Sequence, residues 1–320
     1  MQINEQTAFI TDIKQELQKS IVGQEQMIDR LLIALLGGGH ILLEGVPGLA
    51  KTLAIKSLAQ AINADFSRIQ FTPDLLPSDV TGNTIFNINS NEFVVKKGPI
   101  FANFVLADEI NRAPAKVQSA LLEVMQEQQV SIANETYTLE APFMVLATQN
   151  PLEQEGTYPL PEAQLDRFML KTTITYPTRA EEQQVMRQNL ANVRIDIKPV
   201  VTKKQILEAK KHIEQIYLDE KVEQYILNLV FATREPSSPN LKKIKDYIAF
   251  GVSPRGTINL ARAARVHAFI QKRNYTSPED VQAICYDVLR HRIGLSYLAQ
   301  ADGVSTDELI KEILANTEVL

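Results

Sequence analysis

The first half of the chain alternates short apolar runs with amphipathic segments. The apolar runs predict five strands, at 41–43, 66–71, 104–107, 143–148 and 169–174. Between them, apolar residues recur at the three- and four-residue spacing of a helix, most clearly in 51–62 and 115–127. Strands that alternate with helices form a parallel sheet with helices on both faces, and ligands bind at the carboxyl ends of such strands. The pattern therefore predicts an α/β fold.

Two pairs of short alternating segments interrupt this order. Residues 83–88 and 92–96 flank a polar turn, and so do residues 129–132 and 136–139. Each pair predicts a β-hairpin inserted into the α/β fold. The hairpins are either passive decoration at the sheet edge or contact surfaces for a substrate or partner, and none of their residues has a distinctive chemistry.

The pattern becomes helical after Pro177. Helical spacing predicts helices at 179–189, 203–216, 220–233, 254–272, 278–290 and 305–313. The clearest helix start is Ser277, which is followed by Pro278 and two acidic residues. We therefore expect two domains, an α/β core over residues 1–177 and a small all-α domain over residues 178–320.

A glycine-rich turn follows the first predicted strand and leads into the helix that begins at Lys51. The turn and the start of the helix consist of Gly45, Val46, Pro47, Gly48, Leu49, Ala50, Lys51, Thr52 and Leu53. Backbone N–H groups and the helix dipole favour a nucleotide phosphate here, with Lys51 on the β- and γ-phosphates and Thr52 on Mg²⁺. Ala50 replaces the second glycine of the G-x-x-x-x-G-K-[ST] pattern. Because alanine avoids left-handed backbone angles, we expect its φ to lie below zero.

Polar side chains at the ends of two further strands fit the same site. Asp108 and Glu109 follow the strand at 104–107, and Asn150 follows the strand at 143–148. A carboxylate at the end of a buried strand needs a partner; Mg²⁺ is the expected partner of Asp108, and Glu109 is placed to orient an attacking water. The alternatives are an edge strand with a solvated acidic end and a turn-forming asparagine. The nearby phosphate loop favours the first interpretation of the two acids.

Two arginines are candidates for contact with phosphate. Arg167 follows a loop, within the segment 164–168. Arg255 lies in the first turn of a helix that Ser253 caps and Pro254 begins. A cation is unfavourable at a helix N-terminus unless an anion lies opposite. Arg255 is therefore either a surface residue or a ligand of an ATP phosphate.

Composition limits the class of protein. The chain has 320 residues, of which 45% are hydrophobic, a net charge of −5 and one cysteine, Cys285. A single cysteine excludes a disulfide framework and a cysteine metal site. The N-terminus lacks the pattern of an export signal and no apolar run could span a bilayer, so we expect a cytoplasmic protein. The negative charge argues against a nucleic-acid partner.

Taken together, the motifs resemble those of the MoxR family of AAA+ ATPases, and the resemblance covers nearly the whole chain. It rests on the segments 21–24, 45–52, 71–79, 98–101, 106–114, 147–151 and 165–168. Ala50 in the phosphate loop is typical of this family. The resemblance implies a P-loop AAA+ core with hairpin insertions and a small all-α lid, which together bind ATP and Mg²⁺.

The same resemblance implies a role for each candidate residue. The implied roles are an adenine pocket at Ile21, Val22 and Gly23, phosphate and Mg²⁺ binding at Lys51 and Thr52, a Walker B pair at Asp108 and Glu109, sensor 1 at Asn150, sensor 2 at Arg255, and an arginine finger at Arg167. The finger would act on the ATP of a neighbouring subunit, so the resemblance also implies a homo-oligomer, expected to be a hexameric ring.

Three functional hypotheses follow. The first is a ring ATPase that uses hydrolysis for chaperone-like remodelling or maturation of partner proteins, which in this family often carry a von Willebrand factor A domain. The second is a nucleotide-switched protein-binding regulator in which hydrolysis is incidental. The third is a DNA-dependent ATPase, which the acidic balance disfavours.

Overall fold

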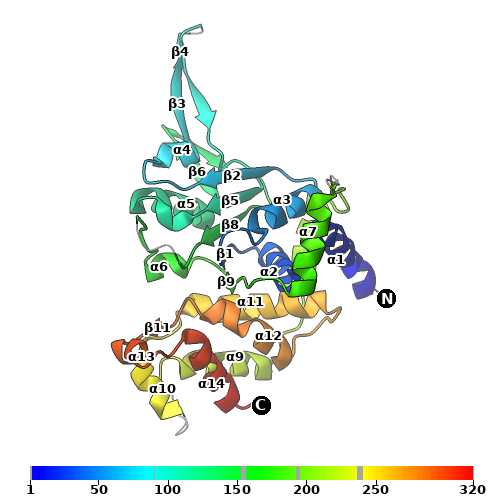
Figure 1. The fold of residues 1–320 in the computed structure, drawn as a ribbon, viewed down its shortest axis with the longest axis vertical. Helices are drawn as coiled ribbons and strands as arrows, with labels where there is room; N and C mark the ends of the chain where they lie inside the picture. The colour runs from blue at the N-terminus through cyan, green and yellow to red at the C-terminus, as the bar shows by residue number, and fades with distance from the viewer. Residues whose placement is uncertain (1, 90, 153–155, 192–194, 236–240, 320) are drawn as a thin grey trace.

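Five parallel strands form the central sheet of the protein. The computed structural model describes residues 2–89, 91–152, 156–191, 195–235 and 241–319. The strands are β1 (Ile41–Glu44), β2 (Phe66–Gln70), β5 (Phe104–Asp108), β8 (Met144–Gln149) and β9 (Leu170–Thr173). Their order across the sheet is β2-β5-β8-β1-β9, and each neighbouring pair is parallel (Figure 1). The five predicted strands are confirmed, with ends that differ by at most one residue.

Helices cover both faces of this sheet, and its three central strands, β5, β8 and β1, are mostly buried and apolar. On one face lie α1 (Gln2–Gln18), α2 (Glu25–Leu36) and α3 (Lys51–Ala61), and on the other lie α4 (Pro77–Thr81) and α5 (Ala115–Glu127). Alternate residues of a strand point to opposite faces. Ile41 and Leu43 pack in the cluster of α1 to α3, whereas Leu42 packs in the cluster of α5. The predicted α/β core is confirmed.

Both predicted hairpins are present. The first pairs β3 (Gly82–Asn87) with β4 (Glu92–Lys97), and the second pairs β6 (Gln129–Ile132) with β7 (Glu135–Thr138). The β3–β4 hairpin projects from the core as a long arm (Figure 1). At its base Gly82 has φ +98°, and a Cβ built there would lie 2.3 Å from the carbonyl oxygen of Lys96. Only glycine allows the two strands to approach this closely.

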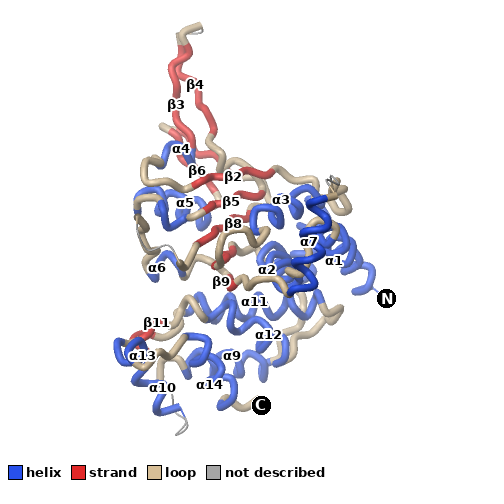
Figure 2. Tube along the Cα trace, in the orientation of Figure 1, coloured by secondary structure: helices blue, strands red, loops and turns tan. Residues whose placement is uncertain are grey.

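The rest of the chain is mainly helical, with loops between the helices, as Figure 2 shows. Its helices are α7 (Arg179–Leu190), α8 (Lys203–Glu214), α9 (Glu220–Ala232), α10 (Lys242–Tyr247), α11 (Pro254–Ile270), α12 (Pro278–Leu289), α13 (Tyr297–Ala301) and α14 (Thr306–Asn316). One short antiparallel pair, β10 (Ile248–Phe250) with β11 (Gly294–Leu295), was not predicted. Ser277 is the N-cap of α12, as expected, and its backbone N–H and hydroxyl donate to Oδ2 of Asp280 at 2.8 Å and 3.2 Å.

The core and the helical part share one apolar cluster. Leu32 of α2 and Leu43 of β1 belong to it together with Leu260 of α11 and Val288 of α12. The division at Pro177 stays a prediction. The sequence assigned helix α7 to the second domain. In the structure, Glu181 in the first turn of α7 lies against Gly23, and the end of the helix lies beside α3.

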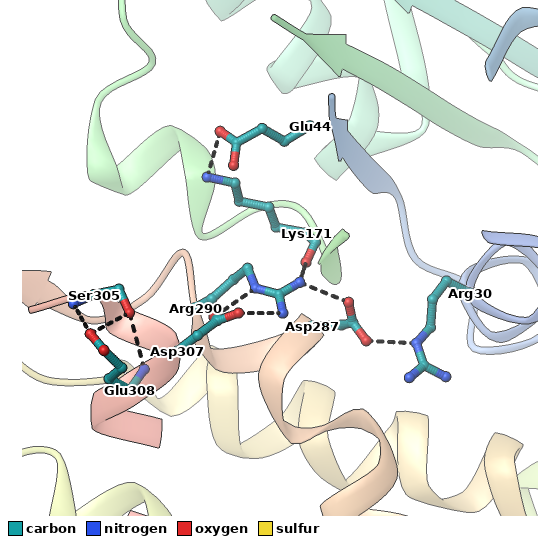
Figure 3. A network of polar contacts seen from close by, with 8 residues as sticks. All are labelled: Arg30, Glu44, Lys171, Asp287, Arg290, Ser305, Asp307 and Glu308. Carbon is teal, nitrogen blue, oxygen red and sulfur yellow. Dashed lines mark hydrogen bonds and ion pairs between the residues drawn. The ribbon is translucent and has the colours of Figure 1, made fainter. Parts of the chain in front are cut away.

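A polar network also fastens α12 to the core (Figure 3). The guanidinium of Arg290 donates to the carbonyl oxygen of Lys171 in β9 at 2.9 Å and to the Asp287 carboxylate at 3.0 Å. The other oxygen of Asp287 accepts from Nε of Arg30 in α2 at 2.6 Å. Asp287 is buried, with 2% of its side chain exposed. Each oxygen of the carboxylate is paired with a guanidinium, so its buried charge is compensated. Asp287 and Arg290 together tie α12 to α2 and β9.

Candidate nucleotide site

Three neighbouring strand ends open onto one cavity of about 460 Å³. Residues lining it come from the turn after β1, from the end of β5 and from the end of β8. They are Pro47 through Leu53, Asp108, Glu109, Thr148 and Asn150, with Arg68 of β2. The structure therefore brings Lys51, Thr52, Asp108, Glu109 and Asn150 together, as the sequence predicted. Gly45 and Val46 precede this lining, and the Gly45 carbonyl faces Lys51.

The backbone of the turn differs from the expectation at Ala50. Its φ is 58° and its ψ is 18°, in the left-handed region, so the expectation of φ below zero was wrong. Gly48 also has positive φ, +86°. Left-handed residues among right-handed ones turn successive N–H groups toward a common centre, which is the geometry of an anion-binding nest. Alanine adopts this conformation at a cost of about 1–2 kcal/mol.

Lys51 is the cation of the cavity. Its Nζ donates to the Gly45 carbonyl oxygen at 2.5 Å, across the mouth of the turn. Burial lowers the pKa of Lys51, and the nearby carboxylates of Asp108 and Glu109 partly offset this effect. A partly desolvated ammonium that faces a carbonyl is better compensated by an anion. The turn with its two left-handed residues and the Lys51 ammonium thus fit a nucleotide phosphate.

Thr148 of β8 contacts both Asp108 and Glu109. The Thr148 hydroxyl donates to Oδ1 of Asp108 at 2.6 Å and accepts from the backbone N–H of Glu109 at 2.9 Å. Glu109 itself has φ 55°, so the chain turns sharply after Asp108. Asp108 and Thr52 offer the carboxylate and hydroxyl oxygens that Mg²⁺ prefers, which makes the donor set compatible with this metal.

Two residues of β2 contact the same acids. Arg68 places Nη2 at 2.6 Å from Oδ2 of Asp108, and the side-chain nitrogen of Gln70 donates to Oε2 of Glu109 at 2.8 Å. Sequence reasoning missed Arg68, Gln70 and Thr148. A signal was available for Arg68 and Gln70. They are two residues apart, so both polar side chains lie on one face of a strand that ends beside Asp108.

The sequence left two interpretations open for Asn150, a turn-forming residue and a residue of the phosphate site. Asn150 lines the cavity and is 8% exposed, and its carboxamide oxygen accepts from the backbone N–H of Leu152 at 3.1 Å. The turn-forming role and the cavity position therefore coexist in one side chain.

The candidates for an adenine pocket lie outside this lining. Ile21 is buried, and Val22 and Gly23 follow it beside α7. Gly23 has φ +70°, and a Cβ built there would lie 2.3 Å from the carboxyl carbon of Glu181. The segment thus approaches the first turn of α7 closely, and the adenine role stays a prediction.

Arg167 and Arg255 also lie away from the cavity around Lys51. Arg167 follows α6 (Glu162–Leu165), and Nη2 of Arg255 donates to Oε1 of Gln126 at 3.4 Å. Nη1 of Arg255 is 4.0 Å from Oδ2 of Asp166, the residue that precedes Arg167. Among the described residues, all that line the cavity belong to the core. The sensor 2 role of Arg255 and the arginine-finger role of Arg167 stay predictions.

Comparison with known proteins agrees with this geometry. Residues 40–170 match the ATPase family associated with various cellular activities (AAA), and residues 242–313 match the AAA lid domain. None of the helices in the described parts of the chain is both long and apolar enough to cross a membrane. Fold and site together define an ATPase of the AAA class.

Relatives place the chain more narrowly. It is 46% identical over 299 residues to Chaperone MoxR1 of Mycobacterium tuberculosis, covering 93% of this chain and 79% of that protein. It is 43% identical to YeaC of Bacillus subtilis, covering 95% and 93% of the two chains. A crystal structure of a Cytophaga hutchinsonii protein, described as a candidate ATPase, superposes with a TM-score of 0.94 at 51% identity and covers 99% and 97% of the chains. The chain belongs to the MoxR family of AAA ATPases, as the motifs indicated.

Proposed function

We propose that the cavity at Lys51 binds ATP together with Mg²⁺ and that hydrolysis takes place there. The observation that carries this proposal is the convergence of Lys51, Asp108 and Glu109 on one cavity, at the carboxyl ends of β1 and β5. Ligands of parallel α/β sheets bind at this edge. Phosphoryl transfer to water depends mainly on positioning and on charge neutralisation, which a site of this composition supplies.

Each residue has a distinct part in the proposed reaction. The Lys51 ammonium and the N–H groups of the turn neutralise the β- and γ-phosphates, while Thr52 and Asp108 hold the metal. Mg²⁺ held by Thr52 and Asp108 would supply positive charge to offset that of the phosphate oxygens. Glu109 accepts a hydrogen bond from the attacking water and orients it. Asn150, whose carboxamide oxygen is engaged by Leu152, offers its NH₂ group to the γ-phosphate.

We further propose that the protein acts as a homo-oligomeric ring, expected to be a hexamer, in which Arg167 reaches the ATP of the adjacent subunit. Arg255 lies beside the segment of Arg167 rather than beside Lys51. This position supports a role for both arginines at a neighbouring subunit's phosphates. An arginine supplied in this way commonly raises kcat by about 10³ or more.

The proposed use of hydrolysis is chaperone-like remodelling or maturation of a partner protein. The printed name of the Mycobacterium relative, a chaperone, supports this use. The β3–β4 hairpin exposes Ile88 at 85% and Phe93 at 74%, and Phe86 packs edge-on against Phe93 at 5.3 Å between ring centroids. Exposed apolar side chains on a projecting arm suit contact with a protein client, for which a protein with a von Willebrand factor A domain is our candidate.

The test is ATP hydrolysis per protomer, measured with Mg²⁺ over a range of protein concentrations. Wild-type activity should rise with concentration as subunits assemble. Arg167→Ala should assemble and bind ATP but lose most of the activity, and Glu109→Gln should bind ATP without turnover. Activity that does not change with concentration and is indifferent to Arg167 would refute the shared site.

The nucleotide-switched regulator is the second candidate, and the Glu109→Gln variant separates it from the first. If a partner complex forms and remains functional with Glu109→Gln, ATP binding alone is sufficient and hydrolysis is incidental. If the partner is bound but not released or matured by this variant, turnover is part of the function.

A further inference from the structure

Arg292, a buried arginine of the helical part, reaches into the core segment that carries Arg167. Its Nε donates to Oδ1 of Asp166 at 2.8 Å, and its Nη2 donates to the carbonyl oxygens of Asp166 at 3.0 Å and Phe168 at 2.6 Å. Its Nη1 donates to the carbonyl oxygen of Met169 at 3.3 Å and to that of Val288 in α12. Only 1% of the side chain is exposed. One guanidinium therefore holds the backbone on both sides of Arg167.

Asp166 is held from a second direction by Ser253. The Ser253 hydroxyl donates to Oδ2 of Asp166 at 2.8 Å. Ser253 is the N-cap of α11. A serine at this position normally accepts a hydrogen bond from a backbone N–H of the first turn. The side chain of Ser253 makes no such bond to the described residues. A cap residue that gives up its usual bond for a contact with another element indicates a functional constraint.

The geometry of this contact is rigid. A guanidinium is planar and its donors form a fixed fork, so several acceptors on one segment leave that segment little freedom. Burial lowers the pKa of Arg292 to about 10, and the Asp166 carboxylate opposes this effect. Arg292 therefore stays charged near neutral pH. Phe168 is fully buried, and its carbonyl oxygen also lies 3.0 Å from Nε2 of His291. Residues 166, 168 and 169 are thus all fixed.

Arg167 itself is less constrained. Its side chain is half-buried, and its Nε is buried without a hydrogen-bond partner in the described part of the chain. An arginine that is held through its neighbours rather than through its own guanidinium can present that group to an anion from another molecule.

We propose that Arg292 and Ser253 are positioning residues that hold Arg167 in place for the ATP of the adjacent subunit. The helical part of one subunit thereby controls hydrolysis in its neighbour through Asp166. This inference rests on the proposed shared site, and its experiment is designed so that the two can fail separately.

Mixed assemblies test it. A subunit with Arg167→Ala has an intact cavity but no finger, and a subunit with Glu109→Gln has an intact finger but no turnover. Mixing the two should restore activity, because some intact cavities then face intact fingers. Arg292→Gln should behave like Arg167→Ala: alone it should lower kcat by about tenfold to a hundredfold, with ATP affinity within about twofold of wild type. Activity should return with Glu109→Gln and should not return with Arg167→Ala.

Arg273→Gln is the matched control. Arg273 is also an arginine of the helical part paired with a buried aspartate, Asp280, but it lies away from the Asp166 segment. Arg273→Gln should lower the free energy of unfolding. It should not show a loss of activity that returns on mixing with Glu109→Gln. Ser253→Ala removes a single bond to Asp166 and should show the pattern of Arg292→Gln in a milder form. It decides the question if Arg292→Gln does not fold.

The outcomes are distinct. If Arg167→Ala recovers with Glu109→Gln but neither Arg292→Gln nor Ser253→Ala does, the positioning role is wrong and the shared site stands. The same holds if Arg273→Gln shows an equal loss and recovery. If Arg167→Ala itself does not recover, the shared site is wrong and the positioning role falls with it.

Discussion

The hydroxyl of Thr148 donates to the carboxylate of Asp108 at 2.6 Å, from the neighbouring strand of the sheet. The same oxygen accepts from the backbone N–H of Glu109. A single buried hydroxyl therefore holds the Asp108 carboxylate and the backbone of Glu109 at the end of β5.

Thr148→Val should separate this orientation from packing, because valine has nearly the same shape without the hydroxyl. Loss of the bond leaves a buried N–H unsatisfied, which costs about 1–3 kcal/mol of unfolding free energy. We expect a lower kcat together with that loss, measured by ATPase assay and urea unfolding. Thr148→Ser keeps the hydroxyl and should retain most of the activity. Equal activity in the valine and serine variants would contradict the role.

Arg68 should compete with Mg²⁺ for Asp108, since its guanidinium bonds the oxygen Oδ2 of that carboxylate. We expect Arg68→Ala to lower the Mg²⁺ concentration needed for half-maximal hydrolysis. Gln70→Ala is the matched control, because Gln70 contacts Glu109 instead. It should change kcat and leave the Mg²⁺ requirement near that of wild type. A higher Mg²⁺ requirement in Arg68→Ala would show that the arginine helps to hold the metal site.

The left-handed conformation of Ala50 makes this position sensitive to the shape of the side chain. Ala50→Gly relieves strain in the folded state. It also raises the conformational entropy of the unfolded chain, which lowers stability by about 0.5–1 kcal/mol, so the free energy of unfolding should change little. Ala50→Val places a β-branched residue at positive φ, which is strongly disfavoured. It should weaken ATP binding measured by titration with a fluorescent nucleotide. Tight binding by the valine variant would mean that the loop changes its backbone angles when ATP binds.

Buried His40 should make the protein less stable in acid. Burial lowers its pKa from 6.5 to about 4, while its Nδ1 accepts from the Val145 N–H and its Nε2 faces the Met125 carbonyl oxygen. Below pH 6.5 the unfolded chain therefore takes up a proton that the folded chain does not. The free energy of unfolding is unaffected by His40 above that pH and falls by about 3 kcal/mol as the pH approaches 4.

Urea unfolding at several pH values measures this effect. His40→Gln should flatten the decline between pH 6.5 and 4. It should not abolish it, because burial also lowers the pKa of His291. If the free energy of unfolding declines with pH as steeply in His40→Gln as in the wild type, His40 is not the cause of the decline.

The sequence predicted those parts of the site that have local signals. The phosphate loop, the acids after β5 and Asn150 after β8 each follow an apolar run, and a parallel sheet brings the ends of such runs together. Arg68, Gln70 and Thr148 were missed because their role depends on which strands are neighbours and in what register. That information is long-range, and the pairing of Gln70 with Asp108 is visible only in the folded sheet.

The backbone of Ala50 and the position of Arg255 were less predictable for other reasons. The conformational preference of alanine is weak enough for the loop to override it. Arg255 was correctly placed in the first turn of a helix, but its surroundings depend on how the helical part packs on the core. That packing is determined by contacts such as Arg292 with Asp166, between residues far apart in the chain.

The apolar cluster that runs from α2 through β1 to α12 has a consequence for how this protein comes apart. Among the described residues, the helical part has no apolar cluster separate from the one it shares with this face of the core. The two parts should therefore melt in one cooperative transition, and amide protons of α12 should exchange about as slowly as those of β1. A fragment that stops at Pro177 would expose the face of α2 that the helices otherwise cover. Proteolysis between the two parts should therefore yield aggregation-prone pieces instead of two independently folded ones.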